Sequence, residues 1–303
     1  MARFEWNWYI EYSSDYHGYL YAIRKNLFSG TTPFQRVDIV DTFTYGRLLI
    51  LDGKTQSAEF DEHIYHEALV HPAAIMHPNP RKIMIMGGGE GAVTRELCRY
   101  KNIEQIIMVD IDGTVVEMCR EHLPEWHQNS FDDSRVELLH MDARRYLEET
   151  DQQFDIIYSD LTEPAEEGPS RFLFTREFYD MVKTKLAPGG ILVVQAGGFS
   201  LDYLDIHAAI RNTLELTFTT VCSYHTFIPS FDCDWGYIIA CEDSSILKVN
   251  REDVDSRIES IAGQLRFYDG ETHEGMFCLQ KDVRQALRDD KTIIEDGKPG
   301  AFY

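Results

Sequence analysis

The sequence of 303 residues lacks long apolar runs, and its apolar stretches are no longer than a β-strand. A membrane-spanning helix needs ~18 or more apolar residues in succession, so we expect no membrane span and no membrane partner. The residues after Met1 also lack the apolar region of a signal peptide. Both absences favour a protein of the cytoplasm.

Paired cysteines are missing as well. The six cysteines are scattered along the chain, with no Cys-x-x-Cys spacing and no neighbouring histidine pattern. Zinc sites and redox-active dithiols use such spacings, so the sequence predicts no metal site and no redox motif. Isolated cysteines of this kind usually pack as small apolar residues, in a reducing compartment.

Positive charge is scarce. The chain has 29 lysines and arginines against 51 aspartates and glutamates, which gives a net charge of -22 at neutral pH. A nucleic-acid-binding surface must neutralise phosphates, so we expect no nucleic-acid partner. An acidic surface attracts cationic ligands instead. Because acidic surfaces also keep proteins soluble, only acids at particular positions can indicate a function.

The most informative segment lies between Lys82 and Asp112. An apolar strand at residues 83–86 leads into Gly87-Gly88-Gly89-Glu90-Gly91, and the next strand ends at Asp110. A glycine turn lets the backbone approach a ligand, and an acid after the second strand suits the hydroxyls of a ribose. The carboxylate of Glu90 would repel a pyrophosphate and attract a cation. The pattern therefore predicts an adenosyl cofactor that carries positive charge.

Two further strands also end in acids. Residues 135–142 form a third strand that ends at Asp142, and residues 154–160 form a fourth that ends at Asp160. In an open parallel sheet the ligand crevice lies beyond the carboxyl ends of the strands. Any one of these acids could simply be a solvent-exposed loop residue after a strand. Together with Glu90 and Asp110, however, they are expected to converge on one pocket.

The alternation of elements predicts the fold class. Residues 1–75 read as short antiparallel strands with a hairpin turn at Asp52-Gly53, and we expect them to form a small β domain. From Lys82 strands and helices alternate, which predicts a Rossmann-like, doubly wound α/β domain at residues 76–303. Helices are expected at residues 61–76, 92–100, 113–122, 176–185, 202–216 and 250–265, and later strands at residues 191–195, 219–224 and 236–241.

Taken together, the motifs resemble the polyamine aminopropyltransferases, the spermidine and spermine synthase family. The resemblance covers nearly the whole chain and includes residues 51–59, 61–67, 87–91, 109–112, 160–164, 173–175 and Gln195. Residues 195–197, 228–231 and 265–272 look more like the thermospermine synthase branch. The resemblance implies a methyltransferase-type Rossmann-like fold, a polyamine substrate, and a homodimer or homotetramer. It also implies decarboxylated S-adenosylmethionine as co-substrate, with no tightly bound cofactor.

The resemblance also implies roles for individual residues. Those expected to bind the co-substrate are Gln35, Gln56, Gly87, Gly89, Glu90, Asp110, Ile111, Asp142, Ala143 and Pro169. Those expected to bind the polyamine are Trp8, Tyr65, His66, Asp160, Glu163, Gln195, Tyr224 and Trp235, with Tyr9 near the same N-terminal aromatic position. The aromatic rings would pack the methylene spacers and face the ammonium groups. We expect His66 to exchange hydrogen bonds without adding charge at neutral pH.

Charge then suggests a mechanism. Decarboxylated S-adenosylmethionine has a sulfonium and a free ammonium but no carboxylate, so Glu90 would bind it and repel ordinary S-adenosylmethionine. An amine of pKa ~10.4 is almost wholly protonated at pH 7, and freeing its lone pair costs roughly 4 to 5 kcal/mol. Asp160 is the predicted catalytic group that accepts this proton. Glu163, three residues on, would hold a second ammonium of the polyamine.

Further acids indicate which amine accepts the aminopropyl group. The acids Glu166, Glu167, Asp232 and Asp234 would suit a third ammonium, which favours conversion of spermidine to a tetraamine over use of putrescine. The commonest spermidine synthase pattern has Asp at positions 90 and 163, Glu at position 110, Gly at position 143 and Tyr at position 231, where this chain has Glu90, Glu163, Asp110, Ala143 and Phe231. A methyltransferase for small molecules, which Glu90 disfavours, and a non-catalytic polyamine-binding protein, which Asp160 disfavours, remain as alternatives.

Overall fold

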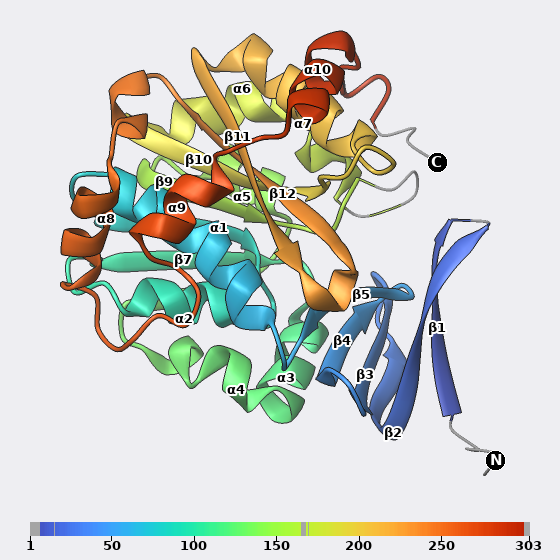
Figure 1. Cartoon of the computed structure of the whole chain (residues 1–303). Helices are drawn as coiled ribbons and strands as arrows, with labels where there is room; N and C mark the ends of the chain where they lie inside the picture. Colours follow the sequence, from blue (N-terminus) through green and yellow to red (C-terminus); the bar gives the residue numbers. More distant parts are fainter. Residues whose placement is uncertain (1–6, 15, 165–167, 169, 300–303) are drawn as a thin grey trace.

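The computed structural model describes residues 7–14, 16–164, 168 and 170–299, and it contains two β-sheets (Figure 1). The smaller is an antiparallel five-stranded sheet in sequence order. Asp52 and Gly53 form its last hairpin turn, with φ angles of 48° and 83° that suit an Asp-Gly pair. Its strands are β1 (Asn7–Ser14), β2 (His17–Thr31), β3 (Arg36–Thr42), β4 (Gly46–Leu51) and β5 (Lys54–Ala58).

Strand β2 is longer than the short strands that the sequence predicts. Its 15 residues pair with β1 up to Ile23 and with β3 from Ile23 onward. Register shifts between Ile23 and Lys25 and between Asn26 and Phe28 interrupt the second pairing. Such irregularities bend a strand, so one continuous segment can serve two neighbours. The hairpin of β1 and β2 lies at one side of the molecule (Figure 1), and Tyr203 of the α/β domain bonds Ser13 near its turn at 3.1 Å.

The larger sheet has seven strands in the order β11-β12-β10-β9-β6-β7-β8. Strands β8, β7, β6, β9 and β10 are parallel to one another, whereas β12 is antiparallel to both β10 and β11. The chain places β7 and β9 on opposite sides of β6, so the strand order reverses there. The strands are β6 (Lys82–Gly87), β7 (Gln105–Asp110), β8 (Val136–His140), β9 (Phe154–Asp160), β10 (Leu186–Gly198), β11 (Thr220–Ile228) and β12 (Cys233–Cys241).

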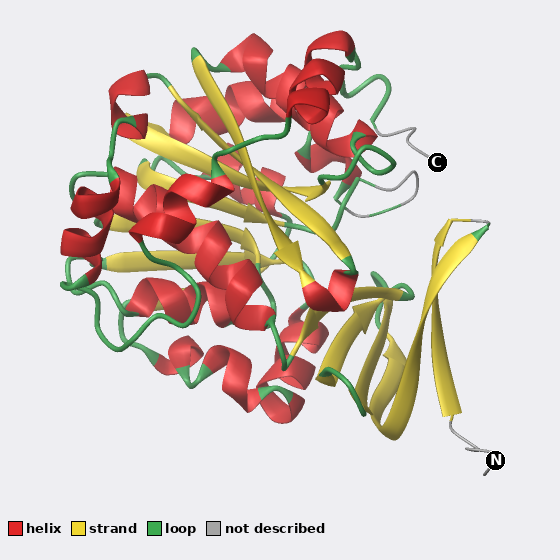
Figure 2. Cartoon of the chain, in the orientation of Figure 1, coloured by secondary structure: helices red, strands yellow, loops and turns green. Residues whose placement is uncertain are grey.

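Helices cover both faces of this sheet, which confirms the predicted doubly wound α/β fold (Figure 2). Alternate residues of each strand point to opposite faces. Ile83 and Ile85 of β6 therefore pack with α1 (Glu62–Met76), α2 (Ala92–Cys98), α8 (Arg251–Ile258) and α9 (Gly270–Met276). Met84 and Met86 pack with α5 (Ala143–Glu149), α6 (Arg176–Lys185) and α7 (Asp205–Thr217). No helix in the described part of the chain is long and apolar enough to cross a membrane.

Most predicted helices are present, with differences at their ends. The helices expected at residues 113–122 and 176–185 are confirmed as α3 (Gly113–His122) and α6. The helix expected at residues 250–265 is shorter than predicted, since α8 ends at Ile258. Gly263, inside the predicted range, has a φ of +83°, which a helix does not allow. Short helices that the sequence analysis did not name are α4 (Pro124–His127), α5, α9, α10 (Lys281–Asp289) and 3-10 turns at Ser130–Asp132, Arg171–Leu173, Pro229–Phe231 and Ser244–Leu247.

An apolar cluster joins the two sheets. Val37, Ile39 and Leu49 of the smaller sheet pack against Val115 and Cys119 of α3. Polar contacts cross the same junction, since the indole of Trp126 donates to the hydroxyl of Ser57 at 2.9 Å. The smaller sheet is thereby fixed against the helices that follow the glycine turn.

Glu67 of α1 anchors the segment that follows α8. Its carboxylate accepts the backbone N–H groups of Arg266, Phe267 and Tyr268 at 2.8 to 3.1 Å, and the side chain is 1% exposed. Tyr268 is buried, so the carboxylate satisfies a donor there that would otherwise lack a partner, and it orders the two N–H groups before it.

Glu67→Gln tests this anchor. The amide keeps the size of the side chain but loses the charge and one acceptor oxygen, so we expect the free energy of unfolding to fall by about 1–3 kcal/mol. Urea unfolding followed by circular dichroism measures the change. The matched control is Glu271→Gln, because Glu271 pairs with Arg251 at 2.7 Å but is 75% exposed. The control is expected to cost about 0.5 kcal/mol or less, and equal effects of the two variants would contradict the anchor.

Candidate active site

The glycine turn and Asp160 lie side by side because β6 and β9 are neighbours in the larger sheet. Gly87 pairs with Asp160 in the ladder, and the N–H of Gly88 donates to the carbonyl of Asp160 at 3.2 Å. Gly87 has a φ of +80°, and a Cβ there would overlap that carbonyl oxygen. Only glycine allows this close approach. Residues 73 positions apart in the sequence thus share one edge of the sheet.

Asp160 is bonded to a tyrosine from another element. The hydroxyl of Tyr65, on α1, donates to Oδ1 of Asp160 at 2.6 Å. Burial raises the pKa of Asp160 to about 6; the charge of His66 lowers it, that of Glu90 raises it, and the Tyr65 hydrogen bond lowers it. A carboxylate of this pKa is ionised at neutral pH yet basic enough to take a proton.

Asp110, at the end of β7, is held beside the same turn. Its Oδ1 accepts the N–H of Asp112 at 2.8 Å, and its Oδ2 lies 2.9 Å from where a Cβ of Gly89 would stand. Burial raises the pKa of Asp110 to about 6, which the Asp112 N–H opposes and the charges of Asp112 and Asp160 reinforce. Asp110 and Asp160 are therefore close enough to influence each other's protonation.

Glu90 faces His66. Glu90 is 8% exposed and His66 is fully buried, with 2.8 Å between Oε1 of Glu90 and Nε2 of His66. The other ring nitrogen of His66 lies 3.0 Å from a carboxylate oxygen of Glu62. Burial alone would lower the pKa of His66, but these two acids raise it to about 10. The expectation that His66 adds no charge at neutral pH stays a prediction. The two flanking carboxylates, which the sequence did not reveal, favour the charged ring instead.

Helix α1 is fixed at its first turn, which positions Tyr65 and His66. Asp61, which precedes the helix, accepts the N–H of Ser230 at 2.6 Å and the hydroxyl of Ser230 at 2.9 Å. This contact also sets the neighbouring Phe231, whose ring centre lies 6.2 Å from that of Tyr65 and 4.8 Å from that of Trp235. Tyr65, Phe231 and Trp235 therefore form a chain of ring contacts, and the Tyr65 end of this chain touches Asp160. The indole nitrogen of Trp235 is buried and has no hydrogen-bond partner among the described residues.

Glu163 comes three residues after Asp160 and lies against Gly197. Its Oε1 sits where a Cβ of Gly197 would be, so glycine is needed there. Burial raises the pKa of Glu163, Lys54 lowers it, and Glu11 raises it. Glu11 is itself buried and accepts the N–H of Thr55 at 3.1 Å and its hydroxyl at 2.6 Å. The smaller sheet thus contributes one acid and one cation to this region, and the sequence analysis named neither.

Several predicted polyamine contacts lie elsewhere or are already engaged. Tyr224 is fully buried, stacks on Tyr237 at 5.2 Å, and donates to the carbonyl of Ala68 at 3.1 Å, so it packs in the core. Gln195 donates to the carbonyl of Leu161 and so fixes the segment after β9.

The two aromatic residues at the start of β1 differ in position. Trp8 is 52% exposed, and strand alternation places it on the face opposite Glu11. Tyr9 shares the face of Glu11 and has its hydroxyl 4.0 Å from where a Cβ of Gly53 would stand. Tyr9 is therefore the better placed of the two to meet a substrate near Glu163.

The other predicted co-substrate residues lie on several elements. Gln35 donates to Asp112 at 3.1 Å, next to Asp110. Asp142 caps α5 by accepting the N–H of Arg145 at 3.0 Å, which leaves Ala143 at the first position of that helix. The remaining co-substrate residues are Ile111, which is half-buried, and Gln56, which donates to the carbonyl of Lys54. Pro169 lies outside the described residues, as do Glu166 and Glu167, which were expected to bind the acceptor.

No metal site accompanies these acids. Within the described ranges, no group of three His, Cys, Asp or Glu side chains is arranged to hold a metal ion. The arrangement offers instead two carboxylates of raised pKa, an acid paired with a cationic histidine, and an aromatic wall. It can bind a cationic ligand and accept a proton from it.

Comparison with known families and proteins agrees with this geometry. Residues 62–252 match the spermine/spermidine synthase domain, and residues 7–59 match the spermidine synthase tetramerisation domain. A polyamine aminopropyltransferase of Sulfolobus acidocaldarius is 42% identical over 299 residues, which cover 98% of this chain and 99% of that protein. Polyamine aminopropyltransferase 2 of Pseudomonas aeruginosa is 41% identical over 292 residues, which cover 96% of this chain and 84% of that protein.

Solved structures show the same fold. The spermidine synthase from Thermotoga maritima is 27% identical, with a TM-score of 0.84 over 93% of this chain and 94% of that chain. A spermidine synthase in complex with the transition-state analogue AdoDATO is 29% identical, with a TM-score of 0.86 over 93% of this chain and 95% of that chain. With both of its parts matched in order and relatives aligned along nearly its whole length, this chain belongs to the spermine/spermidine synthase family.

Proposed function

We propose that this chain transfers the aminopropyl group of decarboxylated S-adenosylmethionine to a terminal amine of spermidine. The products would be a tetraamine of the thermospermine or spermine type and methylthioadenosine. As a member of its family the chain is a polyamine aminopropyltransferase, with decarboxylated S-adenosylmethionine as co-substrate and no tightly bound cofactor. The observation that carries the mechanism is the pair of Asp160 and Tyr65 beside the glycine turn, 2.6 Å apart.

Asp160 supplies the proton acceptor. The attacking amine must lose a proton before or as it displaces the sulfonium, and a carboxylate within hydrogen-bond reach lowers the cost of that loss. The hydroxyl of Tyr65 holds one oxygen of Asp160 in place. The raised pKa of about 6 makes Asp160 a stronger base than an exposed aspartate. The mechanism therefore needs no metal and no covalent intermediate on the protein.

The glycine turn supplies the co-substrate end. We assign the ribose hydroxyls to Asp110 and the aminopropyl ammonium to Glu90, whose carboxylates lie on the same side of the turn as Asp160. Asp142 and Ala143 begin the helix after the next strand and are assigned to the adenine. Glu90 would repel the carboxylate of ordinary S-adenosylmethionine, which argues against a methyltransferase.

A spread of acids beyond Asp160 supports a triamine as the acceptor. Burial together with the charges of Glu163, Asp234 and Asp232 raises the pKa of the Cys233 thiol to about 12, so these three acids are close enough to act on one cysteine. Spermidine has one more ammonium than putrescine and can use an acid that putrescine leaves empty. The competing assignment is a spermidine synthase that uses putrescine. It gains support from the contact of Asp234 with His225 at 3.2 Å, which already occupies that acid.

The exposed face of β1 and β2 supports an oligomer. Trp8, Ile10, Tyr12 and Leu20 are 52%, 48%, 66% and 62% exposed, which is unusual for large apolar side chains on one hairpin. Residues 7–59 match a domain described as tetramerising. We propose that this face pairs with a second copy of the chain in a homodimer or homotetramer, and a cytoplasmic location stays a prediction.

Asp160→Asn is expected to lower turnover about a hundred- to ten-thousandfold while the affinity for the co-substrate stays within about tenfold. The amide keeps the Tyr65 contact but cannot take the proton. Methylthioadenosine release measures turnover. Asp155→Asn is the control, because Asp155 begins the same strand and bonds only the N–H groups of Arg81 and Lys82 in the described structure. Near-normal turnover of Asp160→Asn would remove Asp160 from the mechanism.

Glu90→Gln is expected to weaken decarboxylated S-adenosylmethionine more than S-adenosylmethionine. The variant loses an attraction to the ammonium of the first and a repulsion of the carboxylate of the second, so the discrimination between them shrinks by about 1–3 kcal/mol. Calorimetric titration with both ligands measures this difference. Glu117→Gln, an exposed acid on α3, is the control. Equal weakening of both ligands by Glu90→Gln would show that Glu90 does not discriminate between them.

The acceptor assignment predicts a preference for spermidine over putrescine of about ten- to a hundredfold. The two amines are offered at equal concentration with the co-substrate in excess, and the products are separated by chromatography. A tetraamine should dominate from the first turnovers. If spermidine forms from putrescine as the main product, the chain is a spermidine synthase instead.

A further inference from the structure

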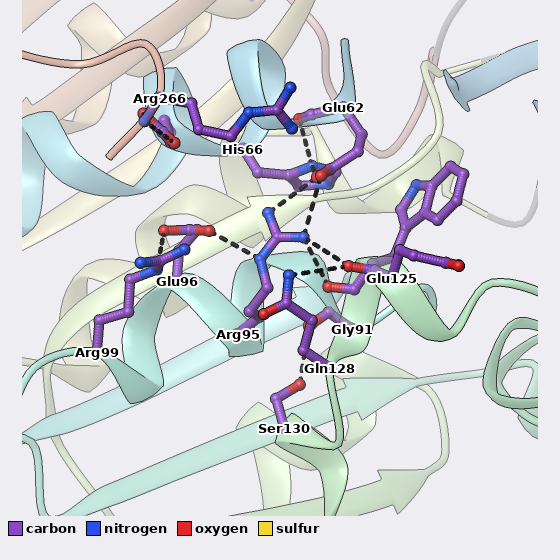
Figure 3. A network of polar contacts seen from close by, with 12 residues as sticks. Glu62, His66, Gly91, Arg95, Glu96, Arg99, Glu125, Gln128, Ser130 and Arg266 are labelled. Carbon is purple, nitrogen blue, oxygen red and sulfur yellow. Dashed lines mark hydrogen bonds and ion pairs between the residues drawn. The ribbon is translucent and has the colours of Figure 1, made fainter. Parts of the chain in front are cut away.

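Buried charges link α2 to the glycine turn, and Figure 3 shows the part of this line from Arg95 to Glu62 and His66. The guanidinium of Arg95 bonds both carboxylate oxygens of Glu62, at 3.1 and 2.9 Å. Glu62 lies 3.0 Å from Nδ1 of His66, and Nε2 of His66 lies 2.8 Å from Glu90. All four side chains are buried. The line therefore connects a structural arginine with the acid that we assign to the co-substrate.

The neighbours of the histidine ring favour its charged form. A neutral imidazole has one N–H and one lone pair. In this structure both nitrogens of His66 lie near oxygens that only accept: Nδ1 meets the carbonyl of Glu62 at 2.7 Å as well as its carboxylate, and Nε2 lies 2.8 Å from Oε1 of Glu90 in an ion-pair contact that is not aligned as a hydrogen bond. A lone pair toward either carboxylate would be repelled. Hydrogen on both nitrogens, which makes the ring an imidazolium, is therefore the state that these contacts favour.

Arg95 and Glu62 are themselves held in place. Arg95 also donates to the carbonyl of Trp126 at 2.8 Å and to Glu96 at 2.8 Å. Burial would raise the pKa of Glu62, but His66 and Arg95 lower it below its ordinary value, so Glu62 stays ionised. A buried ion pair whose partners have several further hydrogen bonds has one defined geometry. Glu62 is thus an immobile anion on the far side of the ring from the site.

We propose that His66 is a permanent internal cation of the active site, and that Glu62 and Arg95 are positioning residues that keep it protonated and aimed at Glu90. The charged groups that face His66 are Glu62 from its own helix, Arg95 behind Glu62, Glu90 from the glycine turn and Asp160 from β9. The consequence for the reaction rests on the proposed roles of Glu90 and Asp160.

The cation has two effects on these acids. It holds one oxygen of Glu90, which leaves the other oxygen for the ammonium of the co-substrate. It also favours the ionised form of Asp160, since a nearby positive charge opposes protonation of a carboxylate. Without this cation, repulsion among the three acids at one sheet edge would favour protonation of Asp160 by solvent. With the imidazolium present, Asp160 is ionised and can accept a proton before the cationic substrates bind.

The protonation state is tested without any assay of activity. Nuclear magnetic resonance of the full chain with isotope-labelled histidine follows the rings between about pH 6 and about pH 9. The signals of His66, assigned by their loss in His66→Gln, should remain those of an imidazolium throughout. In Glu62→Gln the midpoint should fall by at least about one pH unit, because one of the two acids is gone. Glu96→Gln, which contacts Arg95 but not His66, should leave the midpoint unchanged.

The kinetic consequence is tested with His66→Gln. Loss of the cation should raise the pKa of Asp160, so the acidic limb of the pH profile of kcat/KM should move upward by about half to one pH unit. His71→Gln is the matched control, because His71 is equally buried and pairs with Glu96 at 3.1 Å instead of Glu90. A purely structural role would lower kcat at every pH and leave the limb in place.

The two measurements separate the possible failures. A wild-type His66 that titrates near its ordinary pKa of about 6.5 overturns the internal cation, whatever the kinetics show. An unmoved acidic limb in His66→Gln overturns the link to Asp160. If the wild-type profile has no acidic limb and Asp160→Asn is fully active, the proposed function fails while the resonance result still decides the charge of His66.

Discussion

Glu90, Asp110 and Asp160 meet at one edge of the larger sheet, where burial raises the pKa of both aspartates to about 6. Like charges that are partly withdrawn from water repel one another, so this edge is unfavourable unless other groups compensate. Each acid has its own compensation. Asp110 accepts a backbone N–H, Asp160 accepts the hydroxyl of Tyr65, and Glu90 faces the cation of His66. The placement of α1 and α2 follows from this need, because those helices carry Tyr65, His66 and Arg95.

The smaller sheet takes part in the same balance. Gln35 and Thr32 both donate to Asp112, at 3.1 and 2.6 Å, which steadies the segment after β7 next to Asp110. Lys54, at the last hairpin of the sheet, lowers the pKa of Glu163, while Glu11 raises it. The apolar contacts of Val37 and Leu49 with α3 hold the sheet where these charges act. The N-terminal sheet is therefore part of the pocket as well as the carrier of an exposed apolar face.

The sequence predicted what depends on local pattern. Strands ending in Asp110 and Asp160, the glycine turn, and helices α3 and α6 all follow from residue spacing, and the structure has them. Contacts between segments that are distant in the sequence could not be predicted from it. Glu62 stands four residues before His66, a spacing that puts both on one helix face, but nothing in the sequence places Arg95 and Glu90 beside them. Tyr224 was assigned to the polyamine site but is fully buried in the core. The sequence pattern of a strand does not show whether an aromatic residue lies in the core or lines a pocket.

The remaining question is how acids can both bind ammonium groups and help to remove a proton from one of them. A carboxylate next to the attacking nitrogen favours its protonated form, so adding acids there would slow the reaction. The structure separates the two tasks in space. Tyr65 contacts Asp160 and packs on Phe231, which packs on Trp235, while the charges of Glu163, Asp232 and Asp234 act on Cys233. The distal ammoniums of a polyamine would be held by that second group. The attacking nitrogen would then meet one base, aromatic walls, and the field of the imidazolium of His66, all of which are compatible with a neutral amine.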